Sequence, residues 1–442
     1  MRIQLSEHFT YSKLLRFTFP SIAMMIFTSI YSVVDGLFVS NFVGKTPFAA
    51  LNLVYPVIMI LGTLGFMVGT GGSAIVAKTM GEGKPELANQ YFSLLVAASA
   101  VGGAAISLAG VLLARPISLA LGAEGEMLEY CVLYARIILA ANPFFILQNV
   151  FQSFFVSAER PKLGLLVMVG AGLTNIVLDA LLVAVFRFGL AGAAAATAVS
   201  QAVGGLAPVV YFLRRNSSLL RLVRPRFDGR VLLRTCANGS SELMSNISGS
   251  LVNILYNFQL IRLAGEDGVA AYGAIMYVSF IFAAVFIGYS IGSAPVVSYH
   301  YGAGHGSELH SLLVKSLLLT AGAGVAMAAA GAAVSGPLAR LFVGYDRELC
   351  LLTVRGFRLY ALSYLLCGFS IFGSAFFTAL NNGLASAAIS FLRTLVFQCA
   401  SVLLLPLLLG VDGIWLAISV AEALALAVTA ALLAANRRVY KY

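Results

Sequence analysis

The most regular feature of this chain is the alternation of long apolar runs with short polar segments. The runs are dominated by Leu, Ala, Val and Phe, and each ends where charged residues or a Gly- or Asn-rich segment begins. A run of about 20 apolar residues is long enough for a helix that crosses a bilayer. The pattern therefore predicts twelve membrane-spanning helices, over residues 14–41, 48–78, 89–114, 129–157, 161–186, 190–213, 232–262, 269–299, 309–335, 350–379, 384–409 and 412–435.

The composition excludes a water-soluble protein. Of the 442 residues, 60% are hydrophobic and 10% are charged, whereas a soluble domain carries about 25% charged residues. An outer-membrane barrel is also excluded, because its strands would alternate polar and apolar residues. We expect an all-α membrane protein whose first helix stays in the mature chain, because the run from Leu14 is too long for a cleavable signal.

Cysteine and histidine spacing gives no sign of a metal centre. The five cysteines show no CxxC spacing, and His300, His305 and His310 recur every five residues, which does not stack them on one helical face. The sequence also has no HExxH helix, GxGD aspartate or GxxxxGK[ST] phosphate loop. We therefore expect no metal, no cofactor, no enzymatic activity and no ATP-driven step.

The 28 basic residues are distributed unequally between the two sides of the predicted helices. With the N-terminus in the cytoplasm, eighteen lie in cytoplasmic segments, six in outer loops and four within spans. The positive-inside rule then predicts that both termini are cytoplasmic and that the chain lies in the cytoplasmic membrane. The net charge of +10 includes the basic segment 214–231, for which anionic lipid headgroups are a better partner than nucleic acid.

The two halves of the chain repeat each other. Because each half has an even number of spans, both enter the membrane from the same side, and their pseudo-twofold axis lies along the membrane normal. We expect a six-helix lobe at 1–213, a cytoplasmic linker at 214–231 and a second six-helix lobe at 232–442, arranged around a central cavity. A shift of 221 residues pairs Gly44 with Gly265, Gly71 with Gly292, Gly81 with Gly302 and Gly83 with Gly304.

Carboxylates within predicted spans are functional candidates, because a charge at that depth costs at least about 2.5 kcal/mol. Asn175 precedes Asp179 by four residues, so both lie on one helical face, and Thr197 in the next span can add a hydroxyl. Such oxygen ligands suit H⁺ or Na⁺ rather than a transition metal. Alternatively, Asn175 and Asp179 only bridge helices by hydrogen bonds. The four carboxylates are Asp35, Asp179, Glu242 and Glu422.

Three segments resemble one transporter family. Pro20 precedes Asp35 by fifteen residues, TNIVLD occupies residues 174–179, and FGLAGAAAAT occupies residues 188–197. Over essentially its whole length, the sequence resembles prokaryotic members of the multidrug and toxic compound extrusion (MATE) family. The resemblance implies an antiporter that exports organic cations or drugs against H⁺ or Na⁺ entry, and a first helix that bends near Pro20 on protonation. It implies a cation-coupling site of Asp35, Asn175, Asp179 and Thr197.

The chain departs from this family in two places. Many relatives place a proline after the span-five aspartate, whereas this chain has Ala180, so the resemblance does not support a fixed kink there. Another branch carries an acidic pair in the second lobe. Glu242 matches its first member, but span 350–379 holds no acid beyond its start, so we expect no second cation site.

Further polar and flexible residues within the spans are candidates for the substrate cavity. Glu242 either contacts a cationic drug or extends toward the cytoplasm, and Glu422, which has no evident cation nearby, is either functional or a helix-packing hydrogen bonder. Arg393 is a candidate to neutralise one of these two acids. Thioether and aromatic groups suit a cavity that accepts varied cations. The candidate cavity residues are Glu242, Tyr31, Met59, Gln148, Gln152, Tyr256 and Met276.

Other transporter classes fit less well. A major facilitator transporter usually has an Asp-Arg motif between spans two and three, and MGEGKPELANQ lacks it. The alternative is a flippase of lipid-linked or polysaccharide substrates from the same superfamily, which would need a basic cavity. We expect small cationic substrates and membrane lipids as partners, no nucleic acid, and a monomer.

Overall fold

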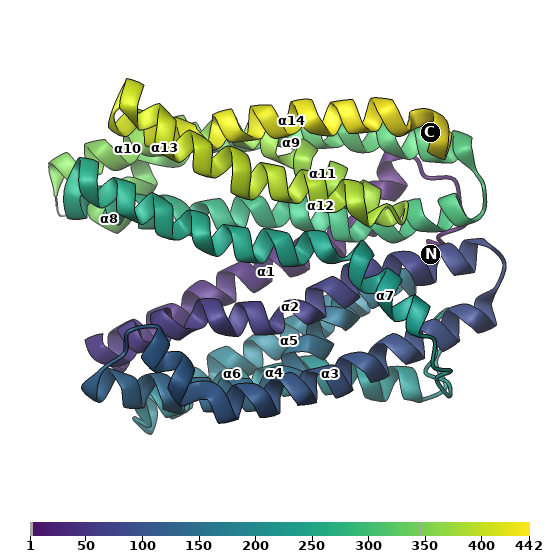
Figure 1. Cartoon of the computed structure of the whole chain (residues 1–442), viewed down its shortest axis with the longest axis horizontal. Coiled ribbons are helices and arrows are strands. Elements are labelled where there is room, and N and C mark those ends of the chain that lie inside the picture. The colour runs from purple at the N-terminus through teal and green to yellow at the C-terminus, as the bar shows by residue number, and fades with distance from the viewer. Residues whose placement is uncertain (1–2, 345) are drawn as a thin grey trace.

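The computed structural model describes residues 3–344 and 346–442. The chain forms two bundles of helices that lie side by side, one built from α1 to α6 and the other from α8 to α14 (Figure 1). The prediction of an all-helical, two-lobe fold is confirmed. Both termini lie at the same end of the molecule (Figure 1), as an even number of spans requires.

Caps and turns set the helix boundaries of the N-terminal lobe. The Thr10 hydroxyl accepts a hydrogen bond from the Lys13 backbone N–H at the start of the first helix, and Pro85 and Pro161 occupy first-turn positions where a missing N–H costs nothing. The elements are α1 (Tyr11–Phe42), α2 (Lys45–Gly81), α3 (Pro85–Ala120), α4 (Gly125–Ser157), α5 (Pro161–Asp179), the π-helix η1 (Ala180–Val185) and α6 (Gly189–Leu213).

The second half begins with a short helix after the linker and then continues in long spans. Residues 214–228 form no helix, and they are held on α3 because the Arg221 N–H donates to Asn89 Oδ1 at 2.7 Å and the Val223 N–H donates to Ser93 Oγ at 2.8 Å. The elements are α7 (Gly229–Asn238), α8 (Ser240–Gly302), α9 (Gly306–Val343), α10 (Arg347–Ala361), α11 (Tyr364–Ala379), α12 (Gly383–Phe391), the π-helix η2 (Leu392–Phe397), α13 (Gln398–Leu409) and α14 (Val411–Tyr440).

The long element α8 is a helical hairpin. Gly265 breaks its helical backbone with φ 63° and ψ −151°, and the rings of Tyr256 and Tyr272 stack with centroids 5.0 Å apart. On one straight helix, residues sixteen apart would be separated by about 24 Å. The chain therefore reverses at Gly265, and α8 contains the two predicted spans that meet there.

Counting α8 twice recovers the predicted number of spans. In the described chain, ten helices are long and apolar enough to cross a membrane, and the pair α10 and α11, bent by 46°, makes an eleventh. The two arms of α8 raise the total to twelve. Two predicted spans need correction: span 232–262 begins as the separate helix α7, and span 350–379 is broken between α10 and α11.

The internal repeat appears in the backbone as well as in the sequence. Glycines related by the repeat shift adopt positive φ at corresponding turns, where other residues would be strained. The fold thus repeats its turns at the same places in both lobes. The pairs are Gly44 (109°) with Gly265 (63°), Gly83 (76°) with Gly304 (74°), and Gly189 (61°) with Gly410 (58°).

The lobes touch through a symmetric glycine crossing, which we define as Gly81 on α2 and Gly302 on α8. A Cβ atom on Gly81 would lie 2.0 Å from the carbonyl oxygen of Tyr299, and one on Gly302 would lie 2.1 Å from the carbonyl oxygen of Lys78. Only glycine permits this approach on both sides. The crossing lies at the C-terminal ends of α2 and α8, in the half of the molecule that holds the termini.

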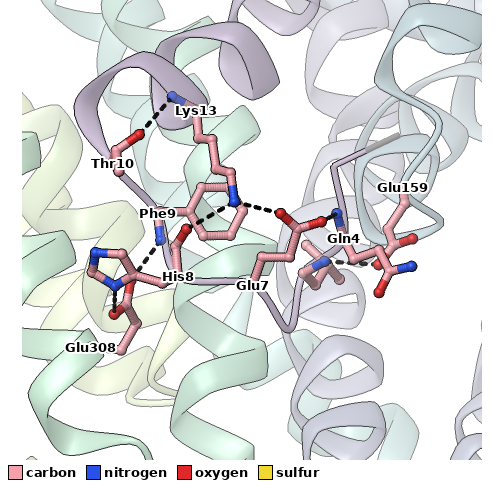
Figure 2. A network of polar contacts seen from close by, with 9 residues as sticks. Gln4, Glu7, His8, Phe9, Thr10, Lys13, Glu159 and Glu308 are labelled. Atoms are coloured by element: carbon pink, nitrogen blue, oxygen red, sulfur yellow. Dashed lines mark hydrogen bonds and ion pairs between the residues drawn. The ribbon is translucent and has the colours of Figure 1, made fainter. Parts of the chain in front are cut away.

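The N-terminal strap, residues 3–10, spans both lobes (Figure 2). The Leu5 N–H donates to Glu159 Oε1 at 2.7 Å, after the end of α4, and the Phe9 N–H donates to Glu308 Oε1 at 3.0 Å, on α9. Nδ1 of His8 lies 2.6 Å from Glu308 Oε2. Because Leu5 and Phe9 are completely buried, the strap is part of the core at this end.

Candidate functional sites in the N-terminal lobe and the central cavity

A close contact between α1 and α5 sets the position of the predicted cation site. A Cβ atom on Gly172 would lie 2.5 Å from the Phe27 ring and 3.0 Å from the Tyr31 ring. Phe27, Tyr31 and Asp35 follow one another at intervals of four residues, so they lie on one face of α1. Seven residues after Gly172, Asp179 lies on the facing side of α5, and the two carboxylates interact electrostatically.

The four predicted coupling residues gather at this contact. Nδ2 of Asn175 lies 3.5 Å from Thr197 Oγ1 on α6, at the limit of a hydrogen bond. The Ser200 hydroxyl donates to the Ala171 carbonyl at 2.7 Å and holds α6 against α5. The structure thus brings the acids, the amide and the hydroxyl of three helices into one cluster, which we call the N-lobe cluster.

The N-lobe cluster is rich in oxygen atoms that have no partner. Both carboxylate oxygens of Asp179, Oδ1 of Asp35 and Oδ1 of Asn175 are buried and accept no hydrogen bond from the described residues. No ion pair links either aspartate to a basic side chain within residues 3–344 and 346–442. A fully buried and a partly buried carboxylate side by side without a counter-charge are costly, so this chemistry suits a proton or a small hard cation.

Three tyrosines surround the aspartates, and the sequence pattern did not associate two of them with the site. Tyr31 on α1, Tyr55 on α2 and Tyr134 on α4 all lie within electrostatic reach of Asp35. Tyr31, which was predicted to line the substrate cavity, lies next to the N-lobe cluster. No local pattern links Tyr55 and Tyr134 to Asp35, because they come from separate helices and meet only through packing.

One helical irregularity lies beside this cluster. The π-helix η1 begins directly after Asp179, so α-helical geometry ends there although Ala180 replaces the proline of many relatives. On α1, the helix runs without interruption through Pro20, and the bend implied by the family resemblance stays a prediction. Pro20 lacks the N–H that would bind the carbonyl four residues earlier, which leaves α1 weaker at that turn.

A cavity of about 470 Å³ lies between the lobes, and two of the predicted substrate-cavity residues, Glu242 and Gln152, line it. Many lining residues form pairs related by the repeat shift of 221 or 222 residues, so the cavity lies on the pseudo-twofold axis. These pairs are Met25 with Asn246, Phe66 with Ile287, Thr70 with Ile291, Ser73 with Ala294, Asn149 with Ile371, Gln152 with Ser374 and Ser153 with Ala375.

Five residues predicted for the cavity do not line it. Tyr256 is 2% exposed and stacks on Tyr272 in the core of the second lobe, against which Met276 also packs. The amide of Gln148 points to Met168, with Nε2 3.4 Å from its sulfur. An apolar span does not reveal which of its faces meets a cavity, and substrate contact by these residues stays a prediction. The residues outside the cavity are Tyr31, Met59, Gln148, Tyr256 and Met276.

An ion pair lies at one wall of the cavity. Glu422 on α14 is fully buried, and Arg393 on η2 binds it with Nε 2.8 and 3.0 Å from the two carboxylate oxygens and Nη2 2.7 Å from Oε1. Arg393 was expected to neutralise either Glu242 or Glu422, and in the structure its partner is Glu422. The expectation that Glu422 has no cation nearby is wrong. Arg393 also lines the cavity, which the sequence pattern did not show.

Comparison with known protein families assigns this fold to one of them. The MatE family model matches residues 20–181 and residues 243–402, well over half of the chain. The chain belongs to the MatE family. The two matched segments of this MatE protein fall one in each lobe and begin 223 residues apart, which agrees with the repeat seen in its turns and cavity.

Individual relatives of this MatE protein are distant. Multidrug export protein MepA of Staphylococcus saprophyticus is 24% identical over 291 residues, which span 65% of this chain but only 64% of that relative's length. Among solved structures, MATE in complex with MaL6 superposes with a TM-score of 0.93 at 23% identity over 98% of both chains. A MOP superfamily transporter from Pyrococcus furiosus superposes at 0.91 with 22% identity, also over 98% of both chains. These similarities establish the shared fold.

Proposed function

We propose that this MatE-family protein is a secondary antiporter that exports organic cations or drugs in exchange for H⁺ or Na⁺. The observation that supports the proposal most directly is the N-lobe cluster, where Asp35 and Asp179 face each other with unpartnered oxygens. An ion from outside the protein must balance their charge. The naming of relatives as multidrug export proteins supports the substrate class.

Helix α1 connects the N-lobe cluster to the opposite lobe and to the cavity. Its residues Thr18 and Ile22 contact Gly292 and Gly288 of the opposite lobe. Met25, one turn further on, lines the cavity and lies with its sulfur 2.8 Å from Nε2 of Gln152. Asp35 occupies the far part of the same helix. We propose that ion binding at Asp35 and Asp179 changes how α1 packs, and that this change alternates the exposure of the cavity.

The orientation follows from the charges and the inter-lobe contacts. We propose that both termini lie in the cytoplasm, so that the glycine crossing and the strap close the cytoplasmic side of the cavity. Cysteines introduced at exposed Thr46 and Arg224 test this. Impermeant thiol reagents are expected to label the first from outside and the second only from the cytoplasm; the reverse labelling would contradict the orientation.

The charges in the cavity fit a flippase less well than they fit an exporter of organic cations. A polyanionic lipid-linked substrate needs a surplus of positive charge, but Glu422 already binds Arg393 and the carboxylate of Glu242 lies in the same cavity. The transporter reading also needs no catalytic group. The cavity therefore favours substrates that contain a cationic centre.

The decisive experiment measures flux in proteoliposomes. Purified protein is reconstituted, a fluorescent cationic dye is loaded, and H⁺ or Na⁺ gradients are imposed separately. We expect one gradient to drive dye movement in the wild type and not in Asp179→Asn. Dye movement that ignores both gradients, or an Asp179→Asn variant with wild-type gradient-driven flux, would contradict the antiport proposal.

A further inference from the structure

Only one of the two hydrogen-bonding edges of the Arg393 guanidinium has a partner among the described residues. Its side edge, formed by Nε and Nη2, binds Glu422. An arginine has a second, equivalent edge formed by Nη1 and Nη2, which fits a carboxylate with two parallel hydrogen bonds. No described residue accepts a hydrogen bond from Nη1, and the side chain keeps 21% of its surface exposed while Glu422 has none. A free donor edge therefore remains on the cavity wall.

Hydroxyl groups continue this wall beside the arginine. Ser390 lies one turn before Arg393, and its hydroxyl is 3.0 Å from that of Ser374. The Ser374 hydroxyl is in turn 2.8 Å from the hydroxyl of Ser386. Ser390 and Ser374 line the cavity with Arg393. Hydroxyl groups donate or accept as their partners require, so this wall accommodates an anionic group next to the guanidinium.

The same cavity also contains a carboxylate, whose charge is opposite to that of the Arg393 guanidinium. Glu242 lines it, and no basic side chain of the described chain forms an ion pair with its carboxylate. The cavity thus offers one free carboxylate and one free guanidinium edge. At about 470 Å³, it falls within the range of sites that hold drug-sized molecules.

We infer that the cavity selects zwitterionic substrates, with the cationic centre near Glu242 and a carboxylate on the Nη1–Nη2 edge of Arg393. This inference rests on the proposed export function and specifies its substrate class. Glu422 acts as a positioning residue, because its grip on the side edge holds the guanidinium plane in place. The η2 segment supports this arrangement, since π-helical turns shift side chains relative to a regular α-helix and occur often at functional sites.

The test compares two dyes that differ only at the carboxylate. Rhodamine B is a zwitterion at neutral pH, and its ethyl ester has the same cationic ring system with the carboxylate blocked. Binding of each to the purified full-length protein is measured by fluorescence polarisation, with protein-free micelles as the blank. The measured quantity is the ratio of the two dissociation constants.

The main variant removes both charges together, as Arg393→Met with Glu422→Gln, so that no buried carboxylate is left without its partner. We expect rhodamine B binding to weaken by at least about tenfold, because two charge-assisted hydrogen bonds are lost, and ester binding to stay within about twofold of the wild type. Glu422→Gln alone keeps the guanidinium but loosens its position, so it is expected to weaken rhodamine B binding by less than the double variant does and to leave ester binding within about twofold of the wild type. Arg358→Met, which removes an exposed arginine outside the cavity, is expected to leave the ratio unchanged.

The outcomes distinguish failure of the zwitterion inference from failure of the proposed export function. An unchanged ratio in the double variant, or a wild type that binds the ester but not rhodamine B, would overturn the zwitterion inference and leave cation export intact. A wild type that binds neither dye would overturn the proposed function together with the inference. Retained ester binding in the double variant also shows that this variant is folded.

Discussion

The two lobes share one helical plan but treat buried charge in opposite ways. In the N-terminal lobe, Asp35 and Asp179 face each other, and no ion pair to them exists in the described chain. In the C-terminal lobe, Glu422 is as fully buried as Asp179, but Arg393 binds both of its carboxylate oxygens. The first arrangement needs an ion from outside to balance it, whereas the second is balanced within the protein.

The repeat makes this difference informative. Because each lobe adopts the same fold without the charges of the other, none of these charges is needed to form a lobe. Each set therefore serves a task of its own lobe: exchangeable charge in the first, and a fixed guanidinium in the second. The repeat shift places Tyr256 at the position of Asp35, Ser401 at that of Asp179, Gln201 at that of Glu422 and Ala171 at that of Arg393.

The largest expected effect tests whether the two aspartates form one unit. Asp35→Asn and Asp179→Asn are each expected to reduce gradient-driven dye flux by roughly 100-fold, and the double variant is expected to be scarcely worse, because groups that act together are not additive. Proteoliposome flux measures this. Asp412→Asn, which removes the partner of exposed Arg355, serves as the control. Multiplicative losses in the double variant would show two independent sites.

The second prediction concerns stability and separates the lobes directly. Arg393→Met leaves Glu422 buried without its partner and is expected to lower the free energy of unfolding by about 3–5 kcal/mol. Adding Glu422→Gln is expected to restore most of that loss. Asp179→Asn removes a charge that has no ion-pair partner, so it is expected not to destabilise. Stability is measured by thermal unfolding in detergent. An Arg393→Met protein as stable as the wild type would refute the contrast between the buried charges of the two lobes.

The third prediction concerns a place where the lobes are alike. Gly81→Ala and Gly302→Ala each force a Cβ atom against a backbone carbonyl of the opposite lobe, and we expect each to destabilise by about 1–3 kcal/mol, as overpacking does. The two losses are expected to be similar because the crossing is symmetric. Gly170→Ala on α5, where the added Cβ meets nothing within 4 Å, is the control. A loss in one lobe alone would deny that the crossing is symmetric.

The smallest expected effect concerns the strap, which binds one glutamate from each lobe. Lys13 beside Glu7 holds the pKa of Glu7 below its ordinary value. A carboxyl with a lowered pKa stabilises the folded state above its unfolded pKa and loses that contribution as the pH falls through the folded value. We expect Glu7→Gln to melt slightly below the wild type at neutral pH. The difference should disappear in acid; a difference that persists there would exclude this ion pair as its cause.

Part of this molecule could be predicted from the sequence because the relevant signals are local. Apolar run length predicted the spans, and the glycine pairs predicted two similar lobes. Gly265, where the chain reverses, lies in the gap between the predicted spans 232–262 and 269–299. The four-residue spacing placed Asn175 and Asp179 on one face. These features depend on helical periodicity and on backbone conformations that glycine tolerates, which act over a few neighbouring residues.

Only the tertiary structure decided which distant residues meet. It placed Tyr55 and Tyr134 beside Asp35, joined Arg393 to Glu422, and moved Tyr256 from the expected cavity into the core. In a membrane helix, the faces toward lipid, core and cavity are all largely apolar, so periodicity does not distinguish them. The packing of one helix against another decides which face a side chain occupies, and with it the chemistry of the site.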